Sequence, residues 1–119
     1  MSNKTSKEDF EYFKKYVKIY QKEFGLTNFK LYFNHDNKHM DAYAYIYSEV
    51  ENGLATIGLT QNWDSLKITK EQLRYSAKHE ILHLLLADLV QVGKYRQSVD
   101  TDFIRAQHAI IRRLENAWN

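Results

Sequence analysis

The chain has 119 residues, of which 44% are hydrophobic, 17 are basic and 15 are acidic, so its formal net charge is +2. A chain of this length is expected to form a single domain over residues 1–119 with its own hydrophobic core. The absence of cysteine excludes disulfides and thiolate metal sites. The near-neutral charge argues against a nucleic-acid partner, and the longest apolar run, ILHLLLADLV, is too short and too polar to span a membrane. No apolar segment follows the first Met, so we expect no signal peptide and a soluble cytoplasmic protein.

The first predicted elements are a helix and a strand. Apolar residues recur at helical spacing over residues 8–24, with lysines and glutamates between them. Thr5 or Ser6 can cap the start of this helix, and Gly25 can end it. Residues 28–34 then alternate between apolar and polar side chains, which predicts a short strand.

Two further strands are predicted on either side of a turn. Residues 41–50 alternate tyrosines with small or aliphatic residues, and residues 54–60 read as the returning strand. The Asn-Gly pair within residues 51–53 is typical of a tight turn. We therefore expect a three-stranded, mostly antiparallel sheet with 54–60 as a candidate edge. The alternation places the rings of Tyr43, Tyr45 and Tyr47 on one face, where we expect a helix to cover them.

The second half of the chain is predicted to be helical. A helix capped by Thr69 is expected to run to Gly93, and a last helix covers about residues 100–118. The order of one helix, three strands and two helices predicts a compact α+β domain.

The pentapeptide His79-Glu80-Ile81-Leu82-His83 is an H-E-x-x-H motif within the predicted helix. Residues four apart on a helix differ by about 40° in direction and about 6 Å in height, so both imidazoles project from one face. Two such nitrogens can bind one Zn²⁺, and Glu80 can act as the general base towards a metal-activated water. The alternative is two partly buried histidines hydrogen-bonded to the backbone or to Glu80. The apolar surroundings favour the metal site, because a buried charge at Glu80 would be costly without a purpose.

The motif supplies two histidines, so any third protein ligand comes from outside it. An elongated zincin pattern would place a histidine at position 89, where this chain has Leu89. If the last helix folds back antiparallel against the motif helix, residues around 107–111 lie level with the motif and Glu115 overshoots by about two turns. His108 is the preferred ligand, because imidazole binds zinc better than the neutral amide of Gln107. The alternatives are no protein third ligand or one of Asp88, Asp100, Asp102, Gln107 and Glu115.

The segments KHEILHLLLADL and HAIIRRLEN resemble a family of small phage and prophage metallopeptidases. That family belongs to the zincin-like group that includes SprT-like and ImmA/IrrE-like domains, and the resemblance covers roughly the last half of the chain. It implies that His79 and His83 are zinc ligands, that Glu80 is the general base, and that the setting is a phage or its bacterial host's cytoplasm. Acidic residues are common in the family where this chain has Gln107 and His108.

The sequence therefore predicts a minimal zincin-like domain that hydrolyses peptide bonds. Zn²⁺ would be held by His79, His83 and His108, with Glu80 as the catalytic base and a peptide or protein substrate docked along strand 54–60. The alternative is a non-catalytic phage accessory or host-interaction protein that keeps a structural or vestigial zinc site.

Overall fold

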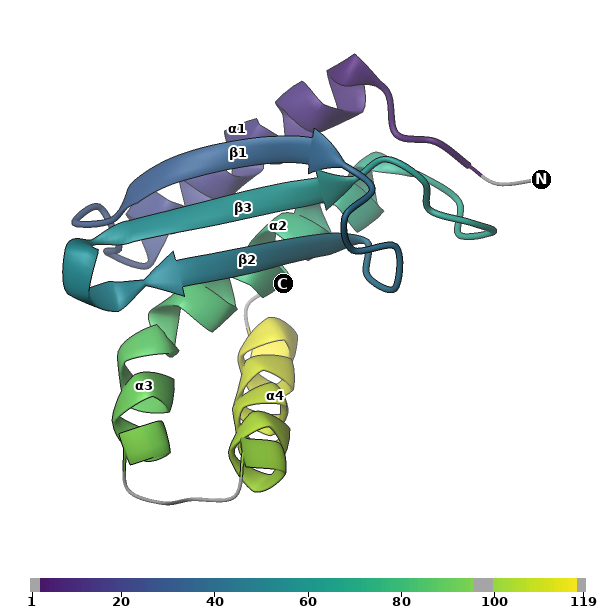
Figure 1. Cartoon of the computed structure of the whole chain (residues 1–119). Helices are drawn as coiled ribbons and strands as arrows, with labels where there is room; N and C mark the ends of the chain where they lie inside the picture. Colours follow the sequence, from purple (N-terminus) through teal and green to yellow (C-terminus); the bar gives the residue numbers. More distant parts are fainter. Residues whose placement is uncertain (1–2, 96–99, 118–119) are drawn as a thin grey trace.

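The computed structural model describes residues 3–95 and 100–117. Figure 1 shows α1 and α2 behind one face of the sheet, with α3 and α4 extending below it as an antiparallel pair. The predicted α+β fold class is confirmed. Among the described residues, no helix combines the length and the apolar character needed to cross a bilayer. The elements are α1 (Lys7–Glu23), β1 (Lys30–Asp36), β2 (Ala44–Glu49), a short 3₁₀ turn (Val50–Asn52), β3 (Leu54–Thr60), α2 (Lys70–Leu85), α3 (Ala87–Tyr95) and α4 (Asp100–Ala117).

The sheet is mixed, with the strand order β1-β3-β2. β1 pairs with β3 in parallel, from Lys30 opposite Leu54 onwards, and β2 pairs with β3 antiparallel. The prediction of a three-stranded, mostly antiparallel sheet is thus confirmed for the three strands and for the β2–β3 pairing, whereas β1 and β3 are parallel. The prediction that 54–60 forms an edge is wrong, because β3 is the central strand. The connection over residues 37–43 carries the chain past β3, so β2 returns on the far side of it.

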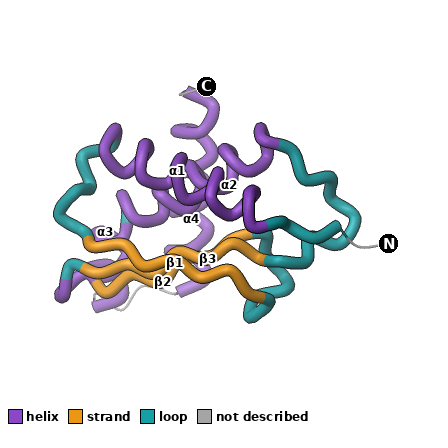
Figure 2. The backbone as a smooth tube through the Cα atoms, turned by 90° about the horizontal axis from the view of Figure 1, so that it is seen from above, coloured by secondary structure: helices purple, strands orange, loops and turns teal. Residues whose placement is uncertain are grey.

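The two faces of the sheet differ sharply in their surroundings. Ala55, Ile57 and Leu59 of β3 are buried in the core beneath α1 and α2, and Figure 2 shows these two helices side by side over the same face. On the opposite face the ring of Tyr45 lies directly over Gly58, where an added Cβ would come within 2.1 Å of it. The expectation that a helix covers Tyr45 and its neighbouring tyrosines is therefore wrong. The predicted alternation along β2 is correct. However, the small and aliphatic residues of β2 face the core, and the tyrosines face the opposite side of the sheet.

The first helix is capped as its sequence predicts. Ser6 accepts a hydrogen bond from the backbone N–H of Asp9, and the Asp9 carboxylate accepts one from the backbone N–H of Ser6. Such a capping box satisfies two backbone donors that a helix start leaves open. Gly25 follows the helix with a φ of 72°, a conformation that favours glycine.

The helix predicted to run from Thr69 to Gly93 is instead two helices. Thr69 caps α2 by accepting from the N–H of Gln72, as predicted, but α2 ends at Leu85 and a new helix, α3, starts at Ala87. Leu86 has a φ of −96° and a ψ of 3° between them. Because the chain changes direction here, α4 folds back against α3 and then packs against α2 (Figure 1). This crossing brings the last helix to the motif.

Candidate metal centre

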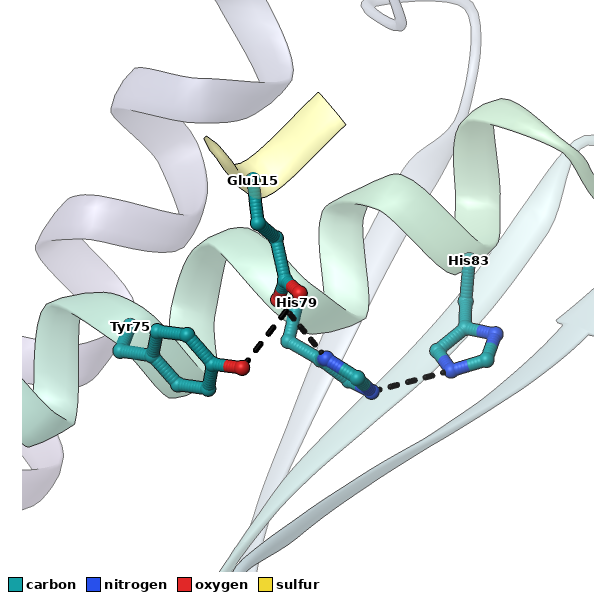
Figure 3. Close-up of polar contacts among 4 residues, drawn as sticks. All are labelled: Tyr75, His79, His83 and Glu115. Atoms are coloured by element: carbon teal, nitrogen blue, oxygen red, sulfur yellow. Dashed lines mark hydrogen bonds and ion pairs between the residues drawn. The ribbon is translucent and has the colours of Figure 1, made fainter. Parts of the chain in front are cut away.

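α2 places His79 and His83 on one face, as the four-residue spacing predicts. Their Nε2 atoms are 3.2 Å apart, and Figure 3 shows the two rings converging. Two nitrogens bound tetrahedrally to one Zn²⁺ at 2.0–2.1 Å are separated by about 3.3 Å. The spacing of the two imidazoles therefore fits a pair of ligands to one zinc ion.

α4 brings His108 to the same place. Its ring centroid lies 4.9 Å from that of His83 and 6.1 Å from that of His79. One nitrogen from each of the three rings lies within 4.8 Å of the others, and this is the only such group of three or more potential ligands among residues 3–95 and 100–117. Ile111, one turn further along α4, is fully buried and anchors this part of the helix. The structure thus brings together the three histidines that the sequence singled out.

Hydrogen bonds orient two of the three rings. Nδ1 of His79 lies 2.9 Å from Oε2 of Glu115, and Nδ1 of His108 lies 3.0 Å from the carbonyl oxygen of Ile104. A carbonyl only accepts, so Nδ1 of His108 carries the proton, and an ionised Glu115 requires the same of His79. Each ring therefore keeps its Nε2 lone pair for a metal. Partners of this kind are the usual support of a zinc-binding histidine.

Glu115 lies closer to the motif than the sequence indicates. The residue is 7% exposed, and its side chain points from α4 towards His79 and accepts a longer hydrogen bond of 3.4 Å from the hydroxyl of Tyr75 (Figure 3). The expectation that Glu115 overshoots the motif by two turns is wrong, because it assumed one straight helix up to Gly93. The break at Leu86 lets α4 cross α2, so both His108 and Glu115 reach it.

The other candidate ligands are less favourably placed. Gln107 lines a cleft that also contains His83, so it lies beside the centre. Asp88 is exposed on α3. The side chains of Asp100 and Asp102 lie outside the described part of the structure.

Burial sets the charge of the motif. His83 has a pKa lowered to about 4 by burial and by the neighbouring His79 and His108, so its ring is neutral near pH 7 as metal binding requires. Glu80 is only 6% exposed, and its burial, helped by the negative charge of Glu115, raises its pKa to about 8. The metal-free protein therefore holds a proton on Glu80 at neutral pH.

Two clefts flank the histidines, and both are lined by β2 or the residues just before it. One of about 270 Å³ has His79 and Glu80 on its α2 side and Ala42 to Ala44 opposite, and one of about 390 Å³ has His83 on one side and Ile46 opposite. Glu80 forms no hydrogen bond with another described residue. Every described side-chain oxygen that is sealed from solvent does have a hydrogen-bond partner, so the carboxyl oxygens of Glu80 are not sealed. Its carboxyl group therefore opens into the first cleft. We call the two clefts together the histidine groove.

Tyr75 is a site residue that the sequence reasoning missed. It lines the cleft that contains Glu80, and its ring centroid lies 6.2 Å from that of His79. The available signal was its position one helical turn before His79, which puts the two side chains on the same face.

Comparisons of the chain with protein-family models, curated proteins and solved structures gave no match. The resemblance to phage metallopeptidases therefore stays a prediction. The convergence of His79, His83 and His108 is the feature that indicates a metal centre.

Proposed function

We propose that this protein is a zinc-dependent metallopeptidase whose ligands are His79, His83 and His108. The observation that carries this proposal is the convergence of three imidazoles beside a buried carboxyl group, Glu80, in the cleft that His79 also lines. Three imidazole nitrogens are a typical donor set for catalytic zinc, which keeps a further position for water. A purely structural site of this kind would have no need for the carboxyl group.

Each group of the chain then has a defined task. A zinc ion held by these histidines would supply a Lewis acid, would lower the pKa of a bound water towards 7 and, by its positive charge, would favour the ionised form of Glu80. The Glu80 carboxylate accepts the proton of the attacking water and can return it to the leaving amine. Glu115 and the carbonyl of Ile104 hold the rings of His79 and His108 in place through their Nδ1 atoms.

The substrate is proposed to lie along β2 instead of strand 54–60. β3 is paired on both sides, whereas β2 pairs only with β3 among the described strands. β2 also packs against α2 and lines both halves of the histidine groove. An extended peptide can therefore add to the open edge of β2 by backbone hydrogen bonds.

Replacing the proposed base tests this function. The variant Glu80→Gln keeps the three histidines, so we expect it to retain one zinc per chain and to lose peptide cleavage by at least about 100-fold, the usual contribution of a general base. Cleavage of a mixed peptide library, followed by mass spectrometry, measures the loss. The exposed Asp88→Asn variant is the matched control and should cleave as the wild type does.

Two results would overturn the proposal. Equal cleavage by the wild type and by Glu80→Gln would rule out the assigned base. A wild-type protein that binds zinc and cleaves no member of the library would instead support the non-catalytic accessory protein.

A further inference from the structure

The half of the histidine groove that contains His83 is a largely apolar cleft of about 390 Å³. Ile46 and Val50 line it from β2 and the turn that follows, and Ala87 and Val90 line it from α3. None of the described residues that line this cleft carries a charge near pH 7, because the pKa of His83 is lowered to about 4. A hydrogen bond made in such surroundings is stronger than one made in open water.

One side chain of this cleft holds an unused hydrogen-bond donor. Besides His83, the side chains that can donate are those of Ser48, Gln91 and Gln107. Gln91 already donates to Glu51 at 3.1 Å, and Ser48 is exposed on β2, where water competes for its hydroxyl. Gln107 is half-buried, and its amide forms no hydrogen bond with any other residue in 3–95 or 100–117. Since every sealed polar side-chain atom in those ranges has a partner, this amide is open to the cleft.

α4 places this amide beside the metal centre. Consecutive residues on a helix differ by about 100° in direction, so the side chains of Gln107 and His108 diverge. The ring of His108 converges with the other two histidines, whereas Gln107 turns to the cleft between α3 and β2. Ile111 lies one turn after Gln107 on the same face and is fully buried, so its packing holds Gln107 at the groove.

Gln107 and the proposed base lie in different halves of the groove. Glu80 shares its half with His79, and Gln107 shares the other half with His83. A donor next to Glu80 would hydrogen-bond the carboxylate and lower its pKa, which weakens a general base. Gln107 leaves the carboxylate free, because neither cleft contains both residues.

We propose that Gln107 is a catalytic residue, which donates a hydrogen bond from its Nε2 to the oxyanion formed from the substrate. The inference rests on the proposed peptidase function. When the oxygen of the attacking water bonds to the carbonyl carbon, its proton passes to Glu80 and the π electrons of the C=O bond move onto the carbonyl oxygen. That oxygen becomes an anion and accepts the N–H of Gln107. As the C=O bond re-forms, the C–N bond breaks and the leaving amine takes the proton from Glu80.

The hydrogen bond acts mainly on the transition state. A hydrogen bond to an ionised oxygen is roughly twice as strong as one to a neutral carbonyl. Gln107 therefore contributes more to the oxyanion than to the bound peptide, and only such a difference accelerates the chemical step.

Binding of a transition-state mimic tests this role without turnover. The probes are phosphinic pseudopeptides with alanine or leucine on either side, in which a tetrahedral, anionic phosphinate replaces the amide that would be cleaved. Zinc-loaded wild type and Gln107→Met are titrated by calorimetry, after metal analysis has measured zinc per chain in both. Methionine is similarly long and unbranched but has no N–H, so we expect phosphinate binding to weaken about 10- to 100-fold while zinc stays at one per chain.

Two controls separate this role from a structural one. Gln91→Met is the matched variant, because Gln91 lines the same cleft while its amide is held by Glu51, and phosphinate affinity should stay within about 2-fold of wild type. Ordinary peptides are also titrated into Glu80→Gln with and without Gln107→Met. Their binding should weaken by less than about 5-fold, because the carbonyl oxygen is neutral in the bound peptide.

Four results would overturn the proposal. The first is equal phosphinate affinity of wild type and Gln107→Met. The second is an equal loss for phosphinates and ordinary peptides, which would make Gln107 a structural residue of the groove. The third is loss of zinc from Gln107→Met, which would make Gln107 a ligand. The fourth is the absence of phosphinate binding by the zinc-loaded wild type.

The two proposals fail separately. Peptide cleavage by the wild type, together with equal phosphinate affinity in Gln107→Met, would reject the donor and keep the peptidase. The expected difference in phosphinate affinity without cleavage of any peptide would keep Gln107 as a donor to anions beside the centre and reject the peptidase.

Discussion

The burial of Glu80 makes the metal-free protein less stable as the pH rises. The pKa of Glu80 is about 8 in the folded protein, above its ordinary value of 4.5, so between these values the folded state holds a proton that the unfolded state has released. The free energy of unfolding falls wherever the unfolded state binds fewer protons. This contribution is therefore complete below pH 4.5 and is lost as the pH rises towards 8.

The Glu80 effect dominates over that of His83 in the neutral range. The pKa of His83 falls from 6.5 to about 4, so the unfolded state binds more protons between these values and stability is lost as the pH falls through them. Above pH 6.5 the change in the Glu80 contribution is the larger of the two, and the remaining change at His83 is common to wild type and Glu80→Gln. The slope of the Glu80 contribution corresponds to about 1.4 kcal/mol per pH unit, so we expect that loss between about pH 6.5 and 7.5.

Urea unfolding of wild type and Glu80→Gln, both in a chelator, measures the effect. Tryptophan fluorescence is a suitable probe because Trp63 is fully buried. The difference in unfolding free energy between the two proteins should change by about 1.4 kcal/mol over that pH unit in favour of the variant, since glutamine cannot titrate there. The exposed Asp88→Asn variant should track the wild type. Parallel pH curves for wild type and Glu80→Gln would refute the reasoning that burial keeps Glu80 protonated.

Three further outcomes follow from the structure. Glu115→Ala should weaken zinc binding about 10- to 100-fold in competition with a chelator, because His79 loses its Nδ1 partner; unchanged affinity would contradict that role. Zinc at about 100 times its dissociation constant should stabilise the wild type against urea by about 2.7 kcal/mol, and the His108→Ala variant should lose most of this gain. A gain that is unchanged in the variant would show that His108 is not a ligand. Gly58→Ala should destabilise the fold by about 1–3 kcal/mol, because its Cβ would meet the ring of Tyr45. Adding Tyr45→Ser should recover part of that loss, and no recovery would place the strain elsewhere.

The features that depend on local sequence were predictable. The cap at Thr69, the end of the first helix before Gly25 and the shared face of His79 and His83 all follow from interactions within a few residues. The order of the strands was not, because it depends on where residues 37–43 carry the chain. β3 did contain a signal, since a glycine at position 58 leaves room for a side chain of a neighbouring strand to lie across it.

The position of His108 beside the motif was predictable for a similar reason, and its surroundings were not. Folding the last helix back against the motif helix indicates residues around 107–111, and the chemistry of zinc ligands selects His108 among them. The role of Glu115 depends on the break at Leu86, and neither glycine nor proline marks that position among the leucines and Ala87. The break follows from tertiary packing, which overrides helix propensity.

The attachment of α4 determines how the metal centre can come apart. Among its side chains that the structure describes, only Ile111 and Glu115 are buried, whereas α1 and α2 share the main core with the sheet. Segments with few buried contacts open at the lowest free energy, so amide hydrogens of α4 should exchange before those of β3. Since His108 and Glu115 both leave with α4, such an opening would disassemble the centre while the rest of the molecule stays folded. The residence time of the metal would then be limited by the motion of one terminal helix.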